Sequence, residues 1–331
     1  RPPTPPASVR NVPYGTFKVE LPMIQRNVIG GVTGRLGGMA MDIENNILFI
    51  AATASNTIEV QTVSNSQSVQ SVLGQPAPVS LIFLQPTRQL IATCATDSTA
   101  RVFKADASGQ LTLERSLTFA GEPGPILHDP AANLCWLGHG VFISSFDPSD
   151  GEKKSELSLE GIGRPVALAI DPTSPRLFTI TTPANDVIVI DRSKADFPAI
   201  AARWPLSERA PAAIAFDRAN KRLFVATRSP SRLIILDSDS GREVAKLDAP
   251  EDPGSISYDP FLRKIYLAGN RGQVRVYQQV SPDTYQPIAT ETTAPGSRTS
   301  LLISEHRRLI VAAPNLGDDQ AARLFVYQIG P

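Results

Sequence analysis

The chain has 331 residues, and its 32 lysines and arginines balance 32 aspartates and glutamates, so its formal net charge is zero. This balance excludes the broad positive surface that general binding to nucleic acids or acidic membranes requires. Hydrophobic residues make up 42% of the chain, which is enough for a large core and excludes general disorder. No run of ~18 apolar residues is present, so we expect no membrane-spanning helix.

The N-terminal segment is rich in proline and begins Arg1-Pro-Pro-Thr-Pro-Pro. Because proline fixes φ and lacks an N–H donor, we expect residues 1–13 to form an extended tail. We expect residues 14–331 to form a single domain.

One sequence pattern recurs at a nearly constant interval. It consists of a proline, an alternating apolar stretch, a turn that often contains Asp-Pro, and a segment such as Arg222-Leu-Phe-Val-Ala. The residues that begin the turns lie 42 to 46 positions apart: Asp42, Leu84, Asp129, Asp171, Asp217, Asp259 and Ile303. This period of ~40–45 residues is typical of β-propeller blades.

The residues six and seven positions after each turn residue are mostly bulky and favour β-strands, so we expect them to pack between neighbouring sheets. They are Leu48-Phe49, Leu90-Ile91, Cys135-Trp136, Leu177-Phe178, Leu223-Phe224, Ile265-Tyr266 and Leu309-Ile310. Each complete unit continues with a third apolar strand, such as Leu233-Ile-Ile-Leu, and a fourth, more polar one, such as Glu243-Val-Ala-Lys-Leu. The sequence therefore predicts an all-β, seven-bladed β-propeller of four-stranded blades.

The two ends of the repeat region predict how the ring closes. The seventh unit stops after its third strand, Leu324-Phe-Val-Tyr, whereas Thr16-Phe-Lys-Val-Glu-Leu near the N-terminus alternates as a β-strand does. We predict that this N-terminal strand completes the last blade and covers sheet edges that would otherwise stay open. Five prolines are predicted to open innermost strands, where a missing N–H costs little: Pro78, Pro123, Pro165, Pro211 and Pro253.

Two segments, Asn185-Asp-Val-Ile-Val-Ile-Asp and Ser231-Arg-Leu-Ile-Ile-Leu-Asp, resemble the YVTN-type repeat, which is related to NHL repeats. The resemblance extends over residues 16–328 and implies a propeller fold. YVTN-like propellers are found in secreted, periplasmic and surface proteins, which implies a secreted or periplasmic location. Similar rings include virginiamycin lyase and lactonases, so the fold alone does not exclude an enzyme.

We call one end of the ring the top face; it carries the loops that lead into the innermost strands and those that join second to third strands. The residues before the strand openings are Arg35, Ala77, Glu122, Arg164, Ala210, Asp252 and Gly296. Arg298 lies near the last of them, and Arg228 and Arg271 lie in the other top loops. These charges form either a solvated rim or a funnel whose arginines bind carboxylates bidentately.

Histidine is rare in this chain, and His139 lies between two glycines, Gly138 and Gly140. We predict a tight hairpin turn that exposes the His139 ring at the top face, where it serves a ligand or is simply part of the surface. His128 falls in an interior column and is expected to be a core residue. Because His128 and His139 lie near opposite ends of one blade, we expect no metal site, and no cofactor is predicted.

The two cysteines, Cys94 and Cys135, are predicted to be free thiols. Cys135 replaces a core leucine, and the two positions are offset by four residues along adjacent blades. That offset is ~13 Å at ~3.3 Å per residue, which exceeds the ~7 Å limit between the Cα atoms of a disulfide.

Three functional hypotheses follow. The first is a monomeric binding or scaffold propeller that holds a small polar or anionic ligand, a glycan or a partner protein on the top face, through Arg35, Arg164, Arg298, Arg228, Arg271 and His139. The second is a lactonase- or lyase-like enzyme at the channel mouth, with His139, Glu122 and Asp252 as acid–base groups. A single-stranded nucleic-acid binder is disfavoured, because the rim carries charges of both signs.

Overall fold

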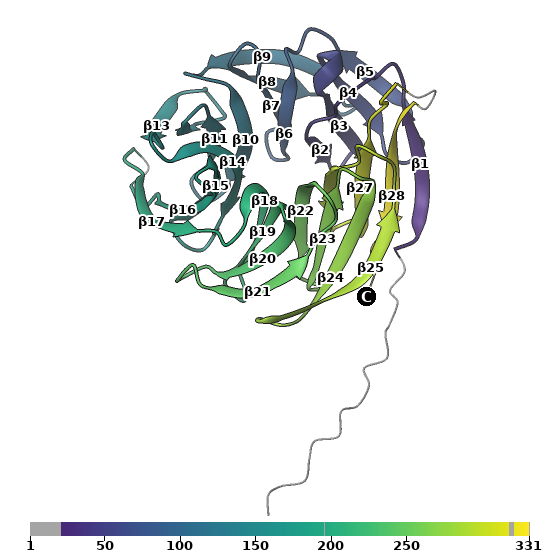
Figure 1. Cartoon of the computed structure of the whole chain (residues 1–331). Helices are drawn as coiled ribbons and strands as arrows, with labels where there is room; N and C mark the ends of the chain where they lie inside the picture. Colours follow the sequence, from purple (N-terminus) through teal and green to yellow (C-terminus); the bar gives the residue numbers. More distant parts are fainter. Residues whose placement is uncertain (1–20, 195, 318–320, 331) are drawn as a thin grey trace, which may run out of the picture.

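The computed structural model describes residues 21–194, 196–317 and 321–330. In these residues, 28 β-strands form seven four-stranded antiparallel sheets, which are arranged as blades around a central axis (Figure 1). The only helical element in the described residues is a 3-10 turn at Thr53–Ser55. The predicted all-β, seven-bladed propeller is confirmed.

Within each sheet the strands follow one another in chain order from the centre outwards, except in the last. The innermost strands of blades 1 to 7 are β2 (Met39–Asp42), β6 (Pro78–Leu84), β10 (Pro123–Asp129), β14 (Gly163–Ile170), β18 (Arg209–Asp217), β22 (Pro253–Asp259) and β26 (Thr299–Ile303). The second strands are β3 (Ile47–Ala52), β7 (Gln89–Cys94), β11 (Leu134–His139), β15 (Arg176–Pro183), β19 (Arg222–Ser229), β23 (Lys264–Gly269) and β27 (Arg308–Ala313). The third strands are β4 (Thr57–Thr62), β8 (Thr99–Ala105), β12 (Phe142–Phe146), β16 (Asp186–Asp191), β20 (Ser231–Asp237), β24 (Gln273–Ser281) and β28 (Ala322–Gln328). The outer strands are β5 (Ser68–Val72), β9 (Leu111–Thr118), β13 (Lys153–Ser158), β17 (Ala199–Pro205), β21 (Glu243–Asp248), β25 (Thr284–Thr292) and, in blade 7, β1 (Met23–Ile29).

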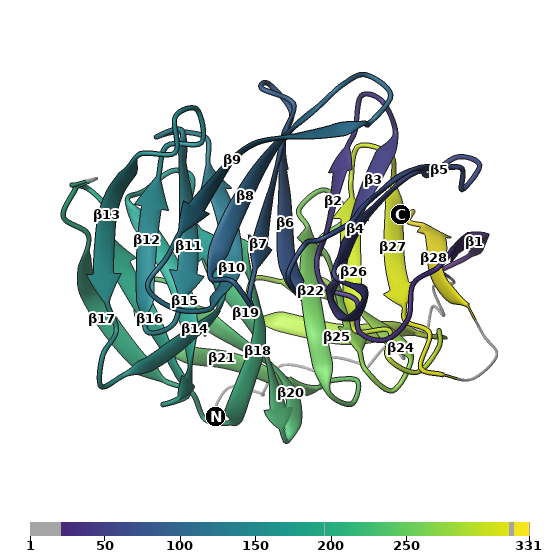
Figure 2. The ribbon, with the colours of Figure 1, turned by 90° about the horizontal axis from the view of Figure 1, so that it is seen from above.

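The core lies between neighbouring blades and is built mainly from the second strands. The fourteen residues predicted to pack between sheets are all at most 1% exposed. Adjacent residues of one strand point to opposite faces of the sheet, so Leu90 packs against blade 1 whereas Ile91 packs against blade 3. Each blade is therefore held on both faces by its neighbours. In the view turned by 90°, the strands run between the two faces of the ring (Figure 2).

The ring closes through an N-terminal strand, as predicted, but not through the predicted residues. The outer strand of blade 7 is β1, which pairs antiparallel with β28. Residues 16–21 had been expected to supply it; residues 16–20 lie outside the described residues, and Leu21 packs between blades 6 and 7. Alternation alone could not decide between two neighbouring stretches, because the choice depends on burial that only the assembled ring provides. Residues 1–13, the predicted tail, also lie outside the described residues.

Each of the five strand-opening prolines precedes an irregularity in its sheet. The register between innermost and second strands shifts directly after Pro78, Pro123, Pro165, Pro211 and Pro253. Such a bulge leaves ladder positions unpaired, and a residue without an N–H fits there. Pro78, Pro123 and Pro253 are the first residues of their strands, whereas β14 and β18 begin two residues before their prolines.

The first turn of most blades is held by a buried aspartate. Asp42, for example, is 0% exposed and accepts a hydrogen bond from the backbone N–H of Asn45 at 3.2 Å. Burial alone would raise the pKa of the equivalent Asp171, but hydrogen bonds from Ser174 and Thr173 lower it to about 2. The carboxylate of Asp171 is thus charged at neutral pH and stabilises its turn. None of the helices in the described residues is long or apolar enough to cross a membrane.

The closing strand provides a matched test of the ring. Ile29 is 2% exposed and packs in the cluster between blades 7 and 1, whereas its neighbour Val28 is 58% exposed. Ile29→Ala should lower the free energy of unfolding by about 2–4 kcal/mol, because it leaves a cavity at the closure. Val28→Ala should change it by less than ~0.5 kcal/mol. Urea unfolding of both variants measures the change in the free energy of unfolding. A loss for Ile29→Ala no larger than the small change expected for Val28→Ala would show that β1 does not stabilise the ring.

Candidate functional site

The top end of the central channel holds a cavity of about 490 Å³, which we call the top cavity. Its lining comes from all seven blades, and it includes four arginines: Arg35 of blade 1, Arg164 of blade 4, Arg228 of blade 5 and Arg298 of blade 7. Three of them precede or begin an innermost strand, and Arg228 lies near the end of β19. The propeller therefore gathers onto one axis cationic side chains that are far apart in the sequence.

One carboxylate lies among these arginines. Asp252 Oδ1 is 2.8 Å from Nε of Arg228, and Asp252 Oδ2 is 4.0 Å from Nη1 of Arg298. Nε of Arg228 also donates to the carbonyl oxygen of Pro253 at 3.0 Å. Asp252 thereby fixes Arg228 in place and offsets part of the positive charge.

The position of Asp252 depends on the preceding blade. Its φ is 48°, in the left-handed region, and its N–H donates to Oγ of Ser231 at 3.2 Å. The same arrangement occurs at Ala77 and Ala210, whose N–H groups donate to Oδ1 of Asn56 and Asn185. A side chain from one blade thus holds the residue before the proline of the next, and this contact compensates for a backbone conformation that costs about 1 kcal/mol or more.

Neighbouring arginines of the top cavity lower one another's pKa values. Burial and then the charges of Arg298 and Arg228 lower the pKa of Arg35, while Glu122 raises it. Burial also lowers the pKa of Arg228, with Asp252 and Arg298 acting in opposite directions. Guanidinium groups remain protonated at neutral pH despite such shifts, so the cavity keeps positive charge that Asp252 and Glu122 offset only in part.

Among the four arginines of the top cavity, Arg35 and Arg164 are the two whose guanidinium groups have no partner in the described residues. Within the described part of the chain, neither makes a side-chain hydrogen bond or an ion pair, and both are exposed to the channel mouth. They also line a second space of about 400 Å³, the side branch, together with Glu122, Thr53 and Thr96. The arrangement leaves ten N–H donors of two guanidinium groups available to an acceptor.

The structure brings together four of the six residues predicted to bind a ligand: Arg35, Arg164, Arg228 and Arg298. Arg271 lines none of the cavities described here; its side chain is 76% exposed and its Nε lies 3.4 Å from Glu251. Glu122 lies in the side branch and Asp252 among the arginines, as their positions before innermost strands suggested.

The prediction that His139 is exposed at the top face was wrong. His139 is 1% exposed and lies between blades 2 and 3, where its ring centroid is 5.0 Å from that of Phe119. Its Nε2 is 2.8 Å from Oγ of Ser144 and 3.6 Å from Oε2 of Glu156. The flanking glycines do form a hairpin, but strand alternation turns the ring towards the neighbouring blade. His139, Glu122 and Asp252 consequently do not form one acid–base group.

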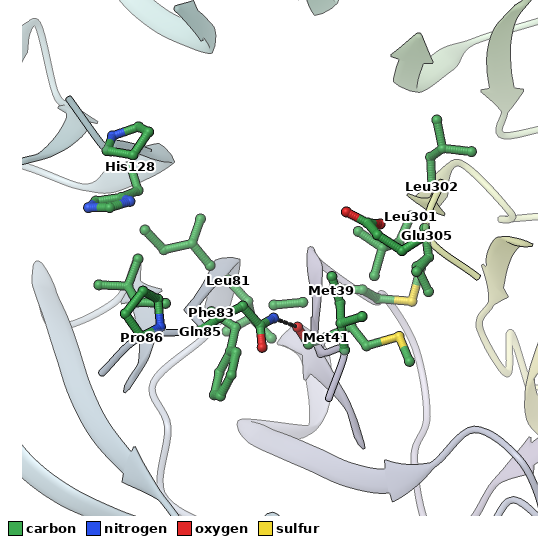
Figure 3. A pocket seen from close by; sticks show the side chains of 16 residues that line it. Met39, Met41, Leu81, Phe83, Gln85, Pro86, His128, Leu301, Leu302 and Glu305 are labelled. Carbon is green, nitrogen blue, oxygen red and sulfur yellow. Dashed lines mark hydrogen bonds between the residues drawn. The ribbon is translucent and has the colours of Figure 1, made fainter. Parts of the chain in front are cut away.

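A second cavity of about 500 Å³ lies at the other end of the channel, and sequence reasoning missed it. We call it the lower cavity. Its lining is mainly apolar, with Met39, Met41, Leu81 and Leu301 among the side chains. Figure 3 shows His128 on one side of it and Leu302 and Glu305 on the other. The sequence predicted His128 as a core residue, but it is half-buried and lines this open space instead.

The cysteines are free thiols, as predicted, and both are buried. Burial raises the pKa of Cys94 to about 11 and that of Cys135 further, so both are neutral thiols. Within the described residues, no three His, Cys, Asp or Glu side chains are placed to hold a metal ion.

Comparison with known proteins agrees with this architecture. A crystal structure of a protein from Lactobacillus plantarum is similar, with a TM-score of 0.72 and 14% identity, covering 81% of this chain and 87% of that one. A chain in a crystal structure of a mitotic checkpoint complex gives a TM-score of 0.78 and 12% identity, covering 99% of this chain and 97% of that one. The chain has a seven-bladed β-propeller fold. At these identities the likeness shows the fold alone. No family model and no curated protein matches the chain, so the YVTN-type resemblance stays a prediction.

Burial of His139 predicts that the protein loses stability in mild acid. Burial lowers its pKa in the folded state, with Glu156 opposing the shift, whereas in the unfolded chain it titrates near ~6.5. The unfolded state therefore binds more protons as the pH falls through ~6.5, and the free energy of unfolding decreases. Denaturant unfolding at pH 7.5 and 5.5 should show a larger loss in the wild type than in His139→Gln. An equal loss in both proteins would contradict this assignment.

Proposed function

We propose that this propeller is a binding protein whose top cavity takes a small anionic ligand. The observation that carries the proposal is the convergence of four guanidinium groups on the top cavity. Asp252 forms ion pairs with two of them, Arg228 and Arg298, whereas Arg35 and Arg164 are left without an ion pair in the described part of the chain. Arginine binds carboxylates and phosphates through paired N–H···O bonds, and partial enclosure by the channel strengthens such contacts. The rigid ring supports this role, because it holds loops from seven blades in fixed positions.

The enzymatic alternative has less support. It required His139, Glu122 and Asp252 to act on one substrate, yet His139 is enclosed between blades and Asp252 is engaged by Arg228. A general acid or base must come within hydrogen-bond reach of the proton it transfers, and His139 does not face the channel.

Removal of one free guanidinium should weaken anion binding. We expect Arg164→Gln to reduce the affinity for succinate or inorganic phosphate by roughly tenfold, because a hydrogen bond to a charged group contributes ~1.5–3 kcal/mol before solvent screening. Arg271→Gln, which changes an arginine of the same face outside the cavity, should leave affinity within about twofold. Isothermal titration at low ionic strength measures both. If neither anion binds to the wild type, or if both variants weaken binding equally, the proposal fails.

Removal of the carboxylate should have the opposite effect. Asp252→Asn keeps the size of the side chain but frees Arg228 and removes a negative charge from the cavity. We expect the affinity for the same anions to rise several-fold, and to fall again as salt is added, because the interaction is electrostatic. Thermal denaturation of the variant establishes that the fold is retained. Weaker anion binding by a folded Asp252→Asn protein would indicate that Asp252 positions the arginines rather than competing for them.

A further inference from the structure

The top and lower cavities adjoin one another along the innermost strands. Four innermost strands, β2, β6, β10 and β26, contribute residues to both, and Met39 of β2 lines both cavities. On β6 the lining passes from Val79 and Ser80 in the top cavity directly to Leu81 in the lower one. The two cavities therefore meet along these strands, at Met39 and between Ser80 and Leu81.

The two halves differ sharply in chemistry. The top cavity holds the four arginines and small or polar residues, such as Gly124 and Ser300. The lower cavity is lined by apolar side chains, and its polar groups lie near its mouth: Gln85, His128 and Glu305. The amide of Gln85 already donates to the carbonyl oxygen of Met41 at 2.7 Å, so it offers little to a ligand.

The charges at the two ends of the channel have opposite signs. An anionic group is attracted to the arginines of the top cavity and repelled by the carboxylate of Glu305 at the lower mouth. Apolar chain is favoured in the lower half, where it replaces water against methionine and leucine side chains. One molecule satisfies both halves only if it has an anionic head and an apolar tail.

We propose that the channel binds a single-chain anionic amphiphile, with its carboxylate or phosphate head at Arg35 and Arg164 and its alkyl tail along β2, β6 and β26 towards the lower cavity. This inference rests on the proposed function, because the head uses the same arginines. It adds the class of ligand and assigns a role to the lower cavity. The affinity should then depend on both the charge of the head and the length of the tail.

A chain-length series tests the proposal on the wild-type protein. Isothermal titration with butanoate, hexanoate, octanoate and decanoate, all below micelle formation, should show affinity rising by up to about fourfold per methylene, the transfer free energy of ~0.8 kcal/mol per CH₂. Decanol, which lacks the charge, should bind at least tenfold more weakly than decanoate. Decanoate should displace succinate, because both heads occupy the top cavity. Decyl phosphate in place of decanoate shows which head is preferred.

Two variants separate head from tail. Arg164→Gln should weaken every member of the series by a similar factor, whereas Leu301→Gln, which places an amide in the lower cavity, should flatten the dependence on chain length. Arg271→Gln is the control, and thermal denaturation establishes that each variant is folded. If Leu301→Gln does not fold, the wild-type series and the competition with succinate still decide.

Failure of the amphiphile proposal can be distinguished from failure of the proposed anion site. Succinate and butanoate binding that depends on Arg164 but does not strengthen with chain length would overturn the amphiphile and leave the anion site standing. Decanol binding as tightly as decanoate, or decanoate binding without displacing succinate, would also overturn it. Absence of binding by every anion would remove both proposals.

Discussion

Each blade of this protein buries both of its faces against its neighbours, so the structure depends on the last blade meeting the first. The contact between β1 and β28 satisfies this requirement, because it completes blade 7 with a strand from the other end of the chain. Once the ring is closed, the seven innermost strands have fixed positions around the axis, and so do the loops that lead into them. The top cavity is a direct result: its arginines come from four blades, and no two of these residues are near one another in sequence. Closure thus stabilises the fold and assembles the site.

The electrostatics of the site differ from those of the whole chain. The formal net charge is zero, yet four arginines line the top cavity and Asp252 pairs with only two of them. Most other charged side chains in the described residues have opposite charges nearby, such as Arg222 with Asp237 and Asp283. A ligand interacts mainly with charges within a Debye length of ~8–10 Å, so the local charge of the cavity matters more for binding than the net charge of the chain.

The sequence predicted the fold because the fold repeats. Seven copies of one unit gave columns of residues that could be compared, and those columns proved to be the buried core. The arginines were found for the same reason, since their positions before innermost strands place them on one face. The failures concern features that do not repeat. The closing strand occurs once, the cover over the His139 ring comes from its contact with Phe119, and the lower cavity exists only where side chains of four blades leave space.

The pairing of β1 with β28 also has a consequence for synthesis. β1 is made before the other strands described for the ring and its partner β28 after them, so most of the described residues separate the two strands. At translation rates of ~5–20 residues per second, roughly 15–60 s pass between the two. During this interval β1 has exposed backbone donors and acceptors, and three of its side chains, Met23, Ile24 and Val28, remain about half exposed even in the finished ring. Until β28 is made, β1 is therefore an unpaired strand with apolar side chains exposed, which favours aggregation at this strand.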